Sequence, residues 1–182
     1  MTQFEAFEDG VEVNGQTVES MIAGAGDVSS IFEDRMKETL ADHGIEELRT
    51  DEWYAQQAYL DAFESVADSI GQRTLTNIGK KIPDQADWPP GIDSVAGGLE
   101  SINEAYQMNH RNGDIGYYEY EQTGDSEGKV FCKNPYPCAF DQGIVKAVVT
   151  RFSPENNLVT VSEESDDCRQ SGGDECVYHV SW

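Results

Sequence analysis

Apolar residues recur every three or four positions through the first 110 residues, the spacing that gathers side chains on one face of an α-helix. This pattern predicts a helix over residues 28–43, with an apolar face formed by Val28, Ile31, Phe32, Met36 and Leu40. Asp27 is a suitable N-terminal cap for this helix and Gly44 a suitable stop. We expect a short strand around residues 10–13, and we interpret GAGD at 24–27 as a loop that precedes the helix.

Residues 51–70 predict the clearest helix of the chain. Its apolar positions step by four, three and four, at Tyr59, Phe63, Val66 and Ile70. Gly71 marks a break or a bend. A shorter helix over 74–82 is expected to end at Pro83, because proline cannot continue a helix. A further helix is predicted over 95–110.

The last third of the chain shows shorter segments that alternate between two patterns. Residues 115–122 and 129–132 predict a β-hairpin, and residues 141–152 predict a helix with a broad apolar face. Two further strands, at 158–162 and 175–182, predict a second hairpin. The expected fold class is therefore α+β: N-terminal helices packed on a small antiparallel sheet, with one helix between two C-terminal hairpins.

The length of 182 residues suits a single domain. Within it, we expect residues 1–50 to form an N-terminal helical extension and residues 51–182 to form a core of ligand-binding type. The chain has 35 acidic and 12 basic residues, a formal net charge of −23. This charge repels phosphate backbones, which argues against direct binding to nucleic acid. Because 38% of the residues are hydrophobic and fall in periodic runs, we expect the chain to fold.

The excess of carboxylates indicates an adaptation to molar salt, as in extreme halophiles, where a Debye length of about 3 Å screens their repulsion. No run of 18 apolar residues occurs, and the beginning, MTQFEAFE, lacks the basic and apolar stretches of a signal peptide. We therefore expect a cytoplasmic protein without membrane interactions. A reducing compartment disfavours structural disulfides and favours metal binding or thiol chemistry by the cysteines.

The four cysteines are the strongest chemical signal in the sequence. They lie in the last 51 residues as two pairs, Cys132 with Cys138 and Cys168 with Cys176. Each pair flanks a loop beside a predicted strand end, so a sheet could bring four thiolates around one tetrahedral zinc ion. The spacings are longer than in common zinc knuckles, so alternatives stay open: unconnected thiols, a disulfide or redox switch, or an iron–sulfur cluster.

The order of the predicted elements and the ending CRQSGGDECVYHVSW resemble the 4-vinyl-reductase-like domain of small-molecule-binding proteins. That superfamily also includes the sensory domain of phenol-responsive transcription regulators, heme nitric-oxide-binding domains and the TRAPP vesicle-tethering subunits. The resemblance covers about residues 53–182. Its sharpest part is a cysteine pair with seven residues between, followed by an apolar strand, which looks like the metal-binding end of the phenol sensors.

In the phenol sensors, zinc is held by three cysteines and one glutamate. The resemblance implies three ligands in this chain: Cys138, Cys168 and Cys176. Ser165 stands where the sensors have the glutamate. We infer that Cys132 completes the ligand set here, with Glu164 as the fallback candidate.

Most of the aromatic residues on the predicted helices and strands are expected to belong to the core. The resemblance implies that they also enclose an apolar pocket with tyrosine hydroxyls at its rim, and the candidate residues are Tyr59, Phe63, Tyr106 and Tyr118. Its ligand would be small and apolar or aromatic. The three histidines are expected on the surface or in strands, and His110 would be the best candidate to ligate a heme.

The function expected from the sequence is ligand binding or sensing without catalysis, supported by a structural zinc site that clamps the last hairpin to the preceding helix. We expect no output domain, so a signal would pass to a separate output protein or through a homodimer, for which the helix around residues 28–40 offers a surface. Two alternatives remain: an enzyme or accessory protein of tetrapyrrole (vinyl) reduction, and a cysteine redox switch. No nucleophile–base pair or cofactor fingerprint supports an enzyme.

Overall fold

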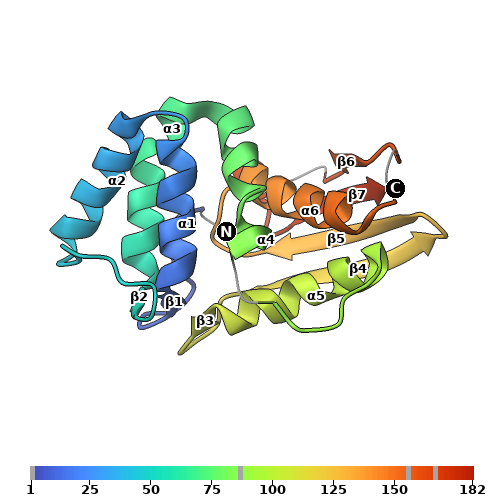
Figure 1. The fold of residues 1–182 in the computed structure, drawn as a ribbon, viewed down its shortest axis with the longest axis horizontal. Helices are drawn as coiled ribbons and strands as arrows, with labels where there is room; N and C mark the ends of the chain where they lie inside the picture. Colours follow the sequence, from blue (N-terminus) through green and yellow to red (C-terminus); the bar gives the residue numbers. More distant parts are fainter. Residues whose placement is uncertain (1–2, 86–87, 155–156, 166–167) are drawn as a thin grey trace.

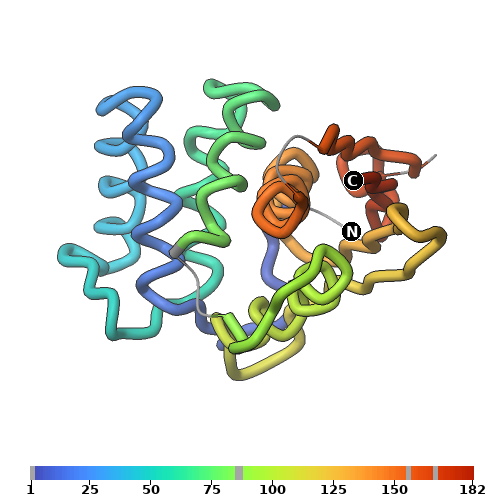
Figure 2. The backbone as a smooth tube through the Cα atoms, turned by 45° about the vertical axis from the view of Figure 1, so that its right-hand side comes forward, coloured from blue at the N-terminus to red at the C-terminus, as the bar shows by residue number. Residues whose placement is uncertain are grey.

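The computed structural model describes residues 3–85, 88–154, 157–165 and 168–182. Helices from the first half of the chain stand beside a four-stranded sheet from the second half, and α6 (Cys138–Phe152) lies between these two layers (Figures 1 and 2). Strand pairing is antiparallel throughout both sheets of the described residues. The α+β class expected from the sequence is confirmed.

The structure contains a helix that the sequence pattern does not predict, α1 (Gly15–Gly26). It follows β1 (Glu12–Asn14), and the Asn14 side chain caps it by accepting a hydrogen bond from the Gln16 amide. The interpretation of residues 24–27 as a loop before a helix is wrong, because Gly24 and Gly26 belong to the last turn of α1. A Cβ atom at Gly24 would lie 3.0 Å from a methyl carbon of Ile78, so tight packing accounts for a glycine of low helix propensity.

The predicted helix over 28–43 is confirmed as α2 (Ser30–Asp42), with a different cap. The Ser29 side chain accepts the hydrogen bond from the Ile31 amide, whereas Asp27 ends α1. Gly44 follows the last helical residues with φ of 80°, a conformation that favours glycine, as expected for the stop. Met36 and Leu40 of this helix lie in the core, whereas Val28 and Ile31, expected on the same apolar face, are exposed.

The two helices predicted over 51–70 and 74–82 form one bent helix, α3 (Gln56–Gly79). Gly71 has φ of 71° and ψ of 163° inside it, which confirms the expected bend. Pro83 does not end a helix but lies in the short α4 (Ile82–Gln85). That prediction is wrong because a first helical turn makes no use of the missing proline amide.

A small three-stranded sheet also escapes the sequence pattern, because its strands have only two or three residues. Strand β1 pairs on one side with β2 (Trp53–Ala55) and on the other with β3 (His110–Arg111). Strand β3 follows directly on α5 (Val95–Met108). The small sheet therefore ties the beginning of the chain to the end of α5.

The larger sheet has the strand order β4 (Tyr117–Gly124), β5 (Glu127–Lys133), β7 (Cys176–Ser181), β6 (Thr160–Glu163). The two predicted hairpin regions are thus present, and they join through the pairing of β5 with β7. Alternate residues of β5 and β7, such as Val130 and Tyr178, are buried, as expected for a sheet covered on one face.

Helix α6 begins three residues earlier than predicted, directly after Pro137. Its Gly143 meets the C-terminal half of α3, where an added Cβ would lie 2.2 Å from the Thr76 carbonyl oxygen. The early start puts Cys138 in the first turn of α6. None of the helices in the described part of the chain has the length and apolarity needed to cross a bilayer.

Candidate functional site

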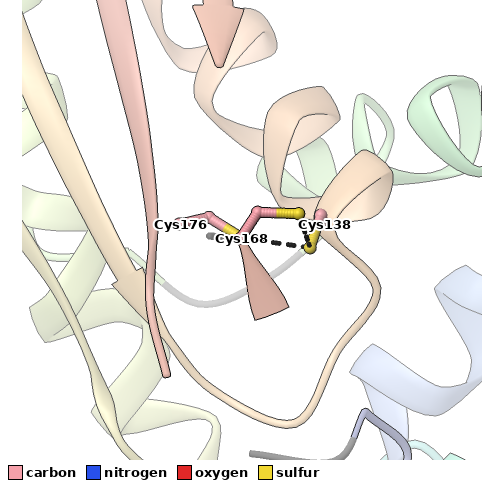
Figure 3. Close-up of side chains that lie close together, drawn as sticks. All are labelled: Cys138, Cys168 and Cys176. Carbon is pink, nitrogen blue, oxygen red and sulfur yellow. Dashed lines mark hydrogen bonds between the residues drawn. The ribbon is translucent and has the colours of Figure 1, made fainter. Parts of the chain in front are cut away.

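Three cysteines from separate elements converge near one end of the larger sheet. Cys138 is the first residue of α6, Cys176 is the first residue of β7, and Cys168 precedes the 3-10 turn η1 (Arg169–Ser171), as Figure 3 shows. The Cys138 sulfur lies 3.0 Å from that of Cys176 and 4.0 Å from that of Cys168. All three sulfurs lie within 4.8 Å of one another; Cys138 and Cys176 are buried, and Cys168 is 9% exposed. Such a set of soft donors suits zinc or an iron–sulfur cluster.

The fourth cysteine, Cys132, lies next to this group without belonging to it. It sits on β5 directly opposite Cys176 on β7 and is fully buried. Within the described residues, the set of sulfurs that are all within 4.8 Å of one another contains only Cys138, Cys168 and Cys176. The structure therefore brings together three of the four cysteines that the sequence suggested as ligands.

The electrostatics of the group favour a thiolate. The hydrogen bond between the Cys138 and Cys176 sulfurs lowers the pKa of Cys176 well below its ordinary value; burial opposes this shift, and the charge of Arg169 adds to it. The same hydrogen bond and burial raise the pKa of Cys138 far above its ordinary value. The pair therefore favours a thiolate on Cys176, and the thiolate is the form of cysteine that binds a metal cation.

Glu163 at the end of β6 and Glu164 directly after it have different partners. Glu164, the fallback ligand, forms an ion pair with Lys129 at 3.2 Å and is directed away from the cysteines by that contact. Glu163 pairs with Tyr178 on β7, and with Cys138 it lines a polar surface pocket of about 270 Å³. Ser165 donates a hydrogen bond to the Glu163 carboxylate at 2.9 Å. Of these two carboxylates, Glu163 is therefore the one that shares a pocket with a cysteine of the group.

A buried ion pair between Asp141 and Arg169 adjoins the cysteines. Both side chains are at most 1% exposed. Arg169 also donates to the side chain of Asn134 and to the Tyr136 carbonyl oxygen, and Asp141 accepts a 2.6 Å hydrogen bond from the Tyr118 hydroxyl. Burial raises the pKa of Asp141 to about 6, although Arg169 and the hydrogen bonds from Tyr118 and Asn134 act in the opposite direction. In a chain with 35 acidic residues, nothing in the sequence singles out Asp141.

An apolar cavity of about 50 Å³ lies between the helices and the larger sheet. Side chains from α3, α4, α5, α6 and β4 line it, among them Ile82, Ile102, Ala105 and Phe140. Three of the four pocket residues suggested by the sequence, Tyr59, Tyr106 and Tyr118, are in its wall. Phe63 is not, and packs behind the wall against Tyr59 and Phe140. A buried water needs about 10–15 Å³ by this measure, so the cavity suits a molecule of a few heavy atoms.

His110 forms part of the cavity wall and is held by hydrogen bonds on both ring nitrogens. Nδ1 lies 2.8 Å from the Tyr106 carbonyl oxygen, which can only accept, so Nδ1 carries the proton. Nε2 therefore accepts the hydrogen bond from the Tyr136 hydroxyl at 2.7 Å, and that hydroxyl accepts in turn from Gln56. Burial lowers the pKa of His110 to about 4, so the imidazole is neutral at pH 7. In the sequence, the one signal that His110 belongs to the site is its position near Tyr106 at the end of a predicted helix.

Two residues that line the cavity carry a buried polar atom without a hydrogen-bond partner among the described residues. These atoms are the hydroxyl of Tyr59, whose side chain is 1% exposed, and the indole Nε1 of Trp88. The donors of Tyr136 and His110 are already used, whereas these two remain free to bind an acceptor. The cavity thus combines an apolar wall with two lining residues that carry an unsatisfied donor, a composition typical of a small-molecule site.

No family model matches the chain, and no curated protein matches its sequence. Solved structures of H-NOX domains do resemble the fold. The H-NOX protein of S. oneidensis in the Fe(II)NO state has a TM-score of 0.66 at 12% identity, over 92% of this chain and 98% of that chain. The A71G mutant from K. algicida gives 0.64 at 12% identity, over 92% and 95%. A protein studied for heme distortion in the H-NOX family gives 0.63 at 14% identity, over 93% and 94%.

At this identity, the likeness shows the fold alone. It agrees with one branch of the superfamily named from the sequence, the heme nitric-oxide-binding domains. The placement among 4-vinyl-reductase-like domains stays a prediction, and so does the halophilic adaptation.

A heme does not fit the site as the residues stand. The cavity of about 50 Å³ is far below the 300–1,000 Å³ of pockets for drug-sized ligands, and a porphyrin is larger still. The only nitrogen of His110 that could bind iron is occupied by the Tyr136 hydroxyl, which itself lies in the cavity wall. The same volume argues against a bound tetrapyrrole substrate.

Proposed function

We propose that this protein is a sensor domain without catalytic activity that binds a small molecule directly in its cavity and holds a zinc ion at its cysteines. The observation that carries the proposal is the apolar cavity, whose lining residues Tyr59 and Trp88 have unpartnered donors, beside a compact group of three cysteine sulfurs. The H-NOX-like fold supports a sensing role, and the 4-vinyl-reductase-like resemblance supports direct binding of a small ligand. The signal would pass to a separate output protein or through a homodimer.

The polar atoms of the cavity define the ligand. Tyr59 and Trp88 offer donors, so the ligand must present a hydrogen-bond acceptor, such as a carbonyl oxygen. The wall is otherwise apolar and contains the neutral His110, so the ligand is uncharged. An aromatic ligand, as the sequence suggested, requires side chains to move, because a cavity of 150 Å³ is of the size that holds benzene.

The zinc would be held by Cys138, Cys168 and Cys176. Three thiolates around Zn²⁺ leave one negative charge, and the buried Arg169 beside them compensates it. The fourth ligand is Cys132, which faces Cys176 across the sheet, or Glu163, which shares a pocket with Cys138. When bound, the ion would fix η1 and β7 against the start of α6.

Metal analysis of protein purified without chelators tests the zinc site. We expect one zinc per chain, and its loss in the serine variants of Cys138, Cys168 and Cys176. Comparison of Cys132→Ser with Glu163→Gln identifies the fourth ligand, with Glu164→Gln as the matched control for loss of a carboxylate. Metal-free protein, or zinc retained in all three single cysteine variants, would contradict the proposal.

The ligand site is tested with two molecules of equal shape, acetone and isobutene, of which only acetone accepts a hydrogen bond. Saturation-transfer NMR should show that acetone binds about 3- to 10-fold more tightly, the equivalent of one net hydrogen bond. Tyr59→Phe should reduce the preference for acetone. Tyr54→Phe removes an exposed hydroxyl outside the cavity and should retain the preference. Equal binding of both molecules, or no binding, would contradict the assignment.

The 3.0 Å separation of the Cys138 and Cys176 sulfurs also favours a second function, a redox switch that closes a disulfide between them. Thiol counting with and without a chelator distinguishes the zinc site from the redox switch. Zinc-bound thiols react only after the metal is removed. In a redox switch, treatment with peroxide removes the thiols of Cys138 and Cys176 as they form a disulfide.

A further inference from the structure

The cavity and the cysteine group share one network of buried hydrogen bonds. Tyr118 lines the cavity with its ring and donates its hydroxyl to Asp141 at 2.6 Å. The other carboxylate oxygen of Asp141 is bound by Arg169, the residue that follows Cys168 in the chain. A path of three side chains thus leads from the cavity wall to the cysteine group.

A second branch of the network reaches the cavity through the backbone. Arg169 donates to the Tyr136 carbonyl oxygen at 2.9 Å, and the Tyr136 side chain lies in the cavity wall with its hydroxyl on His110. Asn134 holds both branches together, because its side chain binds Asp141 and accepts from Arg169. A shift of Arg169 would therefore affect two residues of the cavity wall, Tyr118 and Tyr136.

The stability of the fold does not by itself account for this ion pair. Removing two charges from water costs several kcal/mol per ion, and apolar residues of similar volume often replace a buried ion pair without loss. Asp141 and Arg169 are at most 1% exposed, and neither lines the cavity or is a proposed zinc ligand. Their position between the two sites indicates a connecting role.

We infer that binding in the cavity and metal binding at the cysteines are coupled through Tyr118, Asp141 and Arg169. This inference rests on the proposed function. An occupant holds Tyr118 and Tyr136 in the positions where Asp141 and Arg169 meet them, and the metal holds Cys168 and therefore Arg169. Each binding event thus removes part of the ordering cost of the other, so the two affinities rise together, by the same factor in both directions.

The experiment measures the Zn²⁺ dissociation constant by competition with a chromophoric chelator, with and without xenon, a neutral atom that enters apolar cavities. In the wild type, xenon should tighten Zn²⁺ binding about fivefold, the lower end of ordinary coupling. Tyr118→Phe removes the hydroxyl and keeps the ring, and it should abolish the effect of xenon. Tyr117→Phe is the matched control and should preserve the effect, because Tyr117 is next in the chain and its hydroxyl binds Glu175 outside the cavity.

A second variant does not depend on the gas. Ala105→Leu places extra side-chain atoms in the cavity and should tighten Zn²⁺ binding in the wild type but not in Tyr118→Phe. If zinc and xenon both bind but neither changes the affinity of the other, the coupling is overturned and the proposed function stays intact. Absence of zinc binding in the wild type would overturn the proposed function and the coupling with it.

Discussion

His110 provides a direct test of the hydrogen-bonded wall of the cavity. In the folded protein, its imidazole is neutral, with Nδ1 bound to the Tyr106 carbonyl oxygen and Nε2 accepting from Tyr136. Protonation of Nε2 would put two donors face to face, and the buried site does not solvate the charge. The unfolded chain has no such constraint, so acid should favour unfolding through this residue. The perturbation is His110→Gln.

The magnitude follows from the pKa of His110, which burial lowers from 6.5 to about 4. Between these values, the unfolded state binds more protons than the folded state, so stability falls as the pH decreases from 6.5 to 4. The difference of 2.5 pKa units, at about 1.4 kcal/mol each, gives a loss of about 3 kcal/mol. Asp141 acts in the opposite sense, because burial raises its pKa to about 6, but it is present in both proteins and cancels in the comparison.

Urea unfolding of the metal-free, reduced protein at pH 4, 5, 6 and 7, followed by tryptophan fluorescence, measures this effect. His110→Gln should be less stable at pH 7 but should lose about 3 kcal/mol less than the wild type between pH 6.5 and 4. The control His43→Gln removes a surface histidine that pairs with Asp61 at 2.8 Å, and most of the pH dependence should remain. If His110→Gln and the wild type show the same pH dependence, the neutral buried imidazole is refuted.

Three further predictions concern stability. Asp141→Ala should lower the free energy of unfolding in urea by about 3–5 kcal/mol, because it leaves Arg169 buried without its partner. Adding Arg169→Met to this variant should recover part of the loss. If the effects of the two substitutions on the free energy of unfolding simply add, the pairing is contradicted. Gly143→Ala should cost about 1–3 kcal/mol or more, because its Cβ would lie 2.2 Å from a backbone oxygen, whereas Gly124→Ala, with its nearest contact at 3.5 Å, should be nearly neutral; equal melting temperatures would refute the close helix contact. The net charge of −23 predicts that the melting temperature rises between about 0.1 and 2 M KCl, and a flat profile would refute adaptation to salt.

Local rules account for the parts of the fold that the sequence predicts well. The periodic apolar positions identify α2 and the core of α3, and Gly44 and Gly71 mark the stop and the bend where φ is positive. The β4–β5 hairpin follows from strand residues on both sides of a glycine-containing loop. Each of these features depends on residues that are close together in the chain.

Other elements depend on contacts between distant segments, and the sequence pattern misses them. Helix α1 contains glycines that disfavour a helix in isolation but allow close packing, as Gly24 does against Ile78. Strands of two or three residues, such as β3, form only because β1 lies beside them. Local propensity cannot predict elements of this kind, since their stability comes from tertiary packing.

The sequence by itself determined the fold class, the concentration of the cysteines in the last 51 residues and three aromatic residues of the cavity wall, Tyr59, Tyr106 and Tyr118. Only the tertiary structure decided that three sulfurs meet while Cys132 stays beside them, that Arg169 pairs with Asp141 among 35 acidic residues, and that His110 is buried and neutral. The physical reason is that periodicity reports which face of an element is buried. Distances between side chains, and the dielectric around a charge, arise only when the elements pack.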